Sequence, residues 1–130
     1  MAIKEKALKR LAEKLNAAGV VWALGGDYLA AQKGADVAWH GFELYTTADS
    51  LPRADKVLTR LGMKTPHDTA EGFFCEYHFD GADIALTVPG EGAAWQFTAD
   101  RVAETITVLG VPVPCLSLAD AAAAAALPRG

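Results

Sequence analysis

The stretch Val20–Asp27, which reads V-V-W-A-L-G-G-D, decides the fold that the rest of the chain indicates. Its five apolar residues, bounded by glycine on both sides, favour a short buried strand over a helix. Gly25 and Gly26 allow positive φ angles and a close approach of a ligand to the main chain. Asp27 is a favourable N-cap for a helix over 28–33, whose first N–H groups would offer a phosphate site. The alternative is a tight strand-to-helix turn without a ligand, because one Gly-Gly pair is a weak signal.

Length and composition indicate one globular domain, which we expect to span residues 1–130. A chain of 130 residues with 52% hydrophobic residues is long and apolar enough to bury a core. The net charge of −4 gives no electrostatic case for a nucleic-acid binder of the ordinary basic kind, although a locally basic patch stays open.

The absence of long apolar runs predicts a cytoplasmic protein. No stretch of about 18 apolar residues is present, so we expect no membrane span. The charged start of the sequence has no apolar signal-peptide region. Cys75 and Cys115 lie far apart in apolar segments without metal-type spacing, and we expect both to be free, buried thiols.

Three further segments are predicted as helices from their periodicity and end signals. An apolar stripe over 2–18, ended by glycine, predicts the first, whose lysines form either a solvated face or a surface for an anionic partner. Ser50 or Asp49 begins the next, which has a proline in its first turn. Ser117 caps a final alanine-rich helix.

Residues 39–46 alternate in polarity and predict a strand. His40 and Phe42 point to one face, and Gly41 and Glu43 point to the other. Glu43, flanked by aromatic residues, is then either an exposed strand residue or a metal ligand.

Two further segments contain prolines that affect their prediction. The polar segment 64–71 contains proline and is predicted to be a loop, in which His67 and Asp68 are solvated. Pro112 and Pro114 predict that the strand over 111–116 lies at an edge of the sheet.

The clearest local signal is a hairpin over 73–88. Two alternating runs flank Asp80-Gly81, a residue pair typical of a type I′ turn. That turn places Cys75, Tyr77, Phe79, Ile84 and Leu86 on a core face. On the other face it places His78 directly across from Asp83, with Glu76 two residues along. This pair is either a surface cross-strand contact or part of a site.

The arrangement resembles the nucleotidyltransferase superfamily of the polymerase-β type, over most of the chain. The resemblance rests on the strand ending in Gly25-Gly26, the short helix, the strand with Glu43, the run Ala82-Asp83-Ile84 and the closing segment 111–120. It is greatest to the small, minimal nucleotidyltransferases, which include components of toxin–antitoxin systems. The resemblance implies an α/β (α+β) domain, a nucleotidyltransferase-like mixed sheet with helices packed against it.

In that family, Gly-Gly or Gly-Ser opens the helix that holds a nucleoside triphosphate. Three acidic residues, two of them two positions apart on one strand, hold two Mg²⁺ ions that activate the attacking hydroxyl and neutralise the leaving pyrophosphate. The resemblance implies a set of site residues in this chain: Gly25, Gly26 and Asp27 for the nucleotide, Glu43 and Asp83 for catalysis and Mg²⁺, and Glu76 and His78 as substitute metal ligands.

The family pattern is incomplete, and this leaves two functional hypotheses. Gly41 stands where the first paired aspartate is expected, Glu43 stands at the second, and Asp27 stands where serine is common. The protein is either a nucleotidyltransferase that modifies a hydroxyl or phosphate acceptor, or a catalytically inactive nucleotide-binding or protein-interaction module, such as a toxin–antitoxin component. The missing partner of Glu43 favours the second. A homodimer or another protein partner stays open in both cases.

Overall fold

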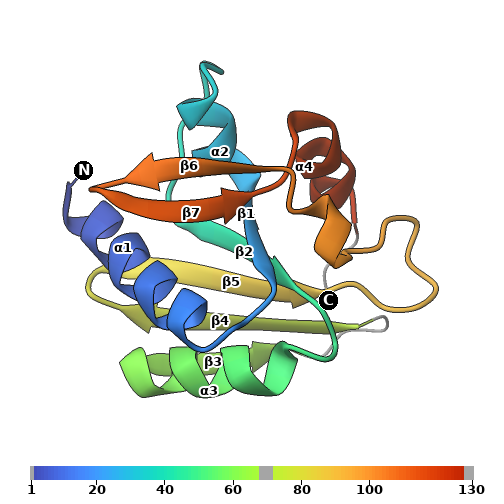
Figure 1. The fold of residues 1–130 in the computed structure, drawn as a ribbon, viewed down its shortest axis with the longest axis horizontal. Coiled ribbons are helices and arrows are strands. Elements are labelled where there is room, and N and C mark those ends of the chain that lie inside the picture. Colours follow the sequence, from blue (N-terminus) through green and yellow to red (C-terminus); the bar gives the residue numbers. More distant parts are fainter. Residues whose placement is uncertain (1, 68–71, 128–130) are drawn as a thin grey trace.

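The structure is a computed structural model that describes residues 2–67 and 72–127. All seven strands belong to one sheet, in the order β3-β4-β5-β2-β1-β7-β6 (Figure 1). The elements follow one another along the chain as α1 (Ala2–Ala17), β1 (Trp22–Gly25), α2 (Gly26–Gln32), β2 (Phe42–Thr46), α3 (Leu51–Leu61), β3 (Met63–His67), β4 (Phe73–Phe79), β5 (Ala82–Val88), the 3₁₀ turn η1 (Ala99–Arg101), β6 (Glu104–Val108), β7 (Val111–Cys115) and α4 (Leu118–Ala125).

The sheet is mixed, as the sequence predicted. Strand β2 runs antiparallel to β1 and parallel to β5 at the centre of the sheet. One face, called the core face below, is apolar and is covered by α1 and α3, which contact each other (Figure 1). Its central side chains are at most 1% exposed: Phe42, Leu44, Tyr77, Ile84 and Leu86. Within the described residues, no helix is long and apolar enough to cross a membrane.

The β1–α2 turn forms where it was predicted, but the helix begins two residues earlier. The N-cap position is Gly25, which has no side chain to cap the helix, and Gly26 has a φ of +71°. Asp27 therefore lies in the first turn of α2, and its predicted role as N-cap is wrong. The conformational freedom of glycine, rather than a capping carboxylate, makes this turn.

The predicted hairpin is confirmed. Asp80 and Gly81 have φ angles of 52° and 76°, as a type I′ turn requires. The register pairs His78 with Asp83, so the core-face and opposite-face residues alternate as expected. Asp80 also accepts a bond from Arg10 of α1 at 3.2 Å, which ties the turn to the helix layer.

The prediction of a loop over 64–71 is wrong for its described part, because Met63–His67 forms β3, paired with β4 alone at the edge of the sheet. Asp68 lies outside the described residues. A polar edge strand needs few apolar side chains, and proline is tolerated there, so Pro66 does not prevent pairing.

The edge position predicted for the strand over 111–116 is also wrong, since β7 lies between β1 and β6. Leu116 donates to the Leu24 carbonyl at 3.0 Å, and main-chain groups two residues apart point to the same neighbour. The main-chain nitrogen atoms of Pro112 and Pro114 therefore face β1. Strand β1 pairs with β7 only at Cys115, the last residue of β7. The side chain of Asn16 binds the Pro112 carbonyl at 3.2 Å, so α1 supplies the partner that a strand would otherwise provide.

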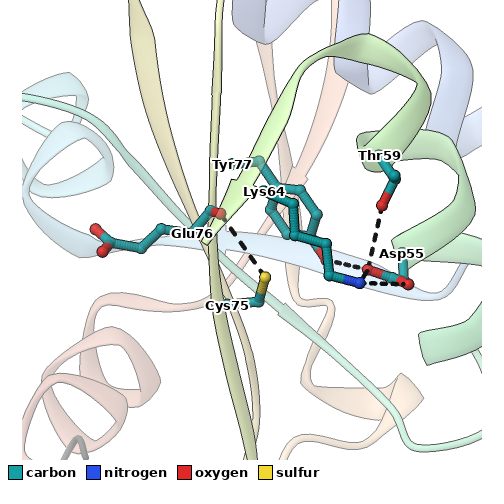
Figure 2. Close-up of polar contacts among 6 residues, drawn as sticks. All are labelled: Asp55, Thr59, Lys64, Cys75, Glu76 and Tyr77. Carbon is teal, nitrogen blue, oxygen red and sulfur yellow. Dashed lines mark hydrogen bonds and ion pairs between the residues drawn. The ribbon is translucent and has the colours of Figure 1, made fainter. Parts of the chain in front are cut away.

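A polar cluster fastens α3 to the core face. Asp55 accepts hydrogen bonds from the buried Tyr77 hydroxyl at 2.6 Å, from Lys64 at 2.8 Å and from Thr59 at 3.4 Å (Figure 2). Partial burial opposes the charge on Asp55, but the bonds from Lys64 and Tyr77 outweigh it and hold the pKa of this carboxyl below its ordinary value. Burial, reinforced by Asp55, raises the pKa of Tyr77.

We expect Asp55→Ala to lower the free energy of unfolding by about 2 kcal/mol at pH 7, because it leaves a buried Tyr77 hydroxyl without its acceptor. A carboxyl whose folded pKa lies below its unfolded value stabilises the fold above the unfolded pKa, about 4, and this stability is lost as the pH falls through the folded pKa. Urea unfolding at pH 7 and pH 3 should therefore show a smaller loss at pH 3. Glu13→Ala, on the exposed side of α1, is the control, and an equal loss at both pH values would contradict the assignment.

Candidate functional site

The second face of the sheet carries the acidic residues. Glu43 of β2 pairs with Ala85 of β5, and Ala85 pairs with Glu76 of β4. Asp83 lies two residues before Ala85 and so shares this face with Glu43, as predicted. Figure 2 shows the Glu76 side chain leaving β4 on the side away from Tyr77. The face that carries Glu76 is therefore opposite the core face.

An open hollow of about 310 Å³ brings these residues together. We call it the carboxylate hollow, and it is lined by Asp27, His40, Gly41, Phe42, Glu43, Phe74, Glu76, Asp83 and Ala85. Its four carboxylates come from four elements, α2, β2, β4 and β5. The fold therefore gathers acidic groups that lie far apart in the sequence.

The Gly-Gly turn adjoins this hollow through Glu43. A Cβ atom on Gly26 would lie 2.7 Å from the Glu43 carboxylate oxygen, and one on Gly25 would lie 2.9 Å from the Tyr45 ring. Packing within the protein therefore accounts for both glycines. Neither glycine lines the hollow, and the role predicted for Gly25 and Gly26 in nucleotide binding stays a prediction.

Gly41 lies directly beside the main chain of β5. A Cβ atom at this position would collide with the main-chain carbonyl oxygen of Asp83. The three nearest atoms all belong to Asp83, and two of them, the carbonyl oxygen and carbon, are main-chain atoms of β5. The position at which the resemblance places the first paired aspartate therefore has no room for that side chain.

His40 and Phe74 are among the lining residues that were not predicted as site residues. The sequence placed His40 on the face of Phe42, but β2 begins only at Phe42, so strand alternation does not extend back to it. His40 is exposed and lines the hollow. Phe74 lies two residues before Glu76, and the period of two in β4 was the signal that could have found it.

The carboxylates suit Mg²⁺ in donor chemistry, since Mg²⁺ prefers oxygen ligands. Among residues 2–67 and 72–127, no three His, Cys, Asp or Glu side chains are grouped closely enough to hold a metal ion by themselves. Mg²⁺ is commonly held by one or two carboxylates together with substrate phosphates and water, rather than by a protein cage. The metal roles of Glu43, Asp83, Glu76 and His78 stay predictions.

The chain matches no protein-family model and no curated protein. Among solved structures, it is similar to a "putative nucleotidyltransferase (TM1012) from Thermotoga maritima", with 20% identity, a TM-score of 0.70, and coverage of 92% of this chain and 81% of the other. The fold is nucleotidyltransferase-like. The fold of ANT(2")-Ia, solved in complex with adenylyl-2"-tobramycin, is also similar, with 16% identity, a TM-score of 0.59, and coverage of 87% of this chain and 68% of the other.

At these identities the likeness is one of fold, and it confirms the nucleotidyltransferase-like mixed sheet expected from the sequence. A fold by itself does not fix an activity. In this nucleotidyltransferase-like fold, any chemistry depends on the side chains of the carboxylate hollow.

Proposed function

We propose that the protein binds a nucleoside triphosphate together with Mg²⁺ at the carboxylate hollow, and that it does so with little or no nucleotidyl transfer. The observation that carries the proposal is the convergence of Asp27, Glu43, Glu76 and Asp83 on one open hollow beside the start of α2. The nucleotidyltransferase-like fold supports a nucleotide as the ligand class.

Charge explains why the metal and the nucleotide should bind together. Four carboxylates around one hollow repel a triphosphate, because like charges at short range are unfavourable even when water screens them. A divalent cation between them attracts both the carboxylates and the phosphates, and so offsets part of this repulsion. Because the described residues form no three-ligand metal group, Mg²⁺ alone should bind weakly, and phosphate oxygens would complete its coordination.

We expect calorimetry to detect binding of ATP, or of GTP as the second probe, in the presence of Mg²⁺ and not in the presence of EDTA. Glu43→Gln and Asp83→Asn should each weaken the binding about tenfold, since each removes a charged oxygen ligand without changing side-chain size. Glu13→Gln makes the same change in net charge on the exposed side of α1 and should leave the affinity unchanged.

Two results would refute the proposed function. One is an absence of heat with both nucleotides at millimolar concentration. The other is binding that survives the double substitution of Glu43 and Asp83, because the nucleotide would then lie elsewhere on the protein.

Nucleotidyl transfer at an ordinary enzyme rate is the second candidate function. It is favoured by Asp27 and Glu76, which add two carboxylates to the hollow beyond Glu43 and Asp83. The acceptor would be a hydroxyl or a phosphate group. The resemblance to minimal nucleotidyltransferases adds the further hypothesis of a component of a toxin–antitoxin pair, with a protein partner or a second copy of the chain.

A further inference from the structure

A cross-strand pair stands beside the carboxylate hollow. His78 of β4 lies opposite Asp83 of β5, and its Nδ1 atom is 2.7 Å from Asp83 Oδ1. The two side chains are 40% and 68% exposed, so neither is fixed by burial. The hydrogen bond is therefore the main restraint that the structure places on the Asp83 carboxylate.

The direction of this bond follows from its chemistry. An ionised carboxylate has no proton to donate, so the Nδ1 atom of His78 carries the hydrogen and donates it to Oδ1 of Asp83. One carboxylate oxygen is held in this way, and a carboxylate has a second oxygen that can bind a cation.

The position of the two residues relative to the hollow indicates which residue orients the other. Asp83 lines the hollow and His78 does not. His78 thus binds Asp83 from outside the hollow, in the way that a hydrogen-bond partner commonly orients a metal-ligating carboxylate. This arrangement disfavours the role of substitute metal ligand that the sequence suggested for His78.

We propose that His78 is a positioning residue, which holds the carboxylate of Asp83 in the orientation that binds the Mg²⁺ ion of a Mg²⁺–nucleoside triphosphate. This inference rests on the proposed function of the hollow. The hydrogen bond restricts the rotamers of an exposed aspartate before the ligand arrives, so that less conformational entropy is lost on binding.

The test compares two substitutions of His78 by calorimetry with ATP, at several Mg²⁺ concentrations. His78→Ala removes the donor and should raise the Mg²⁺ concentration needed for half-maximal ATP binding about tenfold. His78→Asn places an amide N–H near the position of Nδ1 and should restore binding to within about threefold of the natural protein. Thermal unfolding of both variants, compared with the natural protein, shows whether the fold is retained.

A second measurement separates positioning from direct ligation or a general structural role. In an Asp83→Asn background, His78→Ala should cause no further loss of affinity, because His78 acts only through the Asp83 carboxylate. A further tenfold loss in that background, or no loss with His78→Ala alone, would overturn the inference. If the natural protein itself does not bind ATP with Mg²⁺, the proposed function fails, and that result is distinct from normal binding that is insensitive to His78.

Discussion

Gly41→Ala should lower the free energy of unfolding by about 3 kcal/mol, the upper part of the range for overpacking. The added Cβ would collide with the Asp83 carbonyl oxygen, and its next contacts, the Asp83 carbonyl carbon and Cβ, would both be at 3.3 Å. That carbonyl belongs to β5, which is paired on both sides, with β2 and with β4. Because a paired strand cannot move as a flexible side chain does, the chain before β2 would have to shift instead.

Gly92→Ala is the matched control for this experiment. Nothing lies within 4 Å of a Cβ added at Gly92, and the φ of neither glycine is in the left-handed region. Urea unfolding should show a change within about 1 kcal/mol for Gly92→Ala, and this change can be stabilising, since alanine restricts the unfolded chain. If both variants were equally stable, the close approach of Gly41 to β5 would be wrong.

The same contact affects any attempt to introduce the paired carboxylates of the nucleotidyltransferases that the sequence resembles. Gly41→Asp supplies the missing residue type, but it also introduces the Cβ atom that collides with Asp83. We therefore expect this variant to lose stability as Gly41→Ala does, rather than to gain activity. The close packing around Gly41 thus explains why this position carries no side chain.

Nucleotidyl transfer by the natural protein should be at least about a hundredfold slower than a typical enzyme turnover of about 10 per second. A two-metal site stabilises both the attacking and the leaving oxygen through shared ligands. Gly41 contributes no ligand, and the described part of the chain contains no group of three metal-ligating side chains. The longer side chain of Glu43 loses more rotamer freedom when it is fixed than an aspartate does.

The measurement is the transfer of label from α-labelled ATP with Mg²⁺, in the presence of nucleotide, sugar, RNA and protein hydroxyl acceptors. Glu43→Ala and Asp83→Ala set the background. Turnover near 10 per second that either substitution abolishes would establish the enzyme hypothesis and reject the binding module. Turnover that neither substitution affects would indicate a contaminating activity.

Local sequence patterns determined those parts of the protein whose interactions are short in range. The hairpin at Asp80-Gly81 follows from turn chemistry, and its core face follows from a period of two. Ser117 caps α4 as predicted, through a bond from the Asp120 N–H at 3.1 Å. The nucleotidyltransferase-like fold was expected from a resemblance to known proteins, which rests on the Gly25-Gly26 strand end, Glu43, Asp83 and the closing segment 111–120.

Only the tertiary structure decided which residues meet across the sheet. The pairing of β3, the interior place of β7 and the close approach of Gly41 to Asp83 each depend on a neighbouring strand or helix that is distant in sequence. Strand propensity and proline rules apply to one segment and do not say which segment lies beside it. They could not show that Asn16 would donate a hydrogen bond to the Pro112 carbonyl. For the same reason, the sequence could identify the carboxylates singly, whereas their convergence on one hollow required the register of β2, β4 and β5.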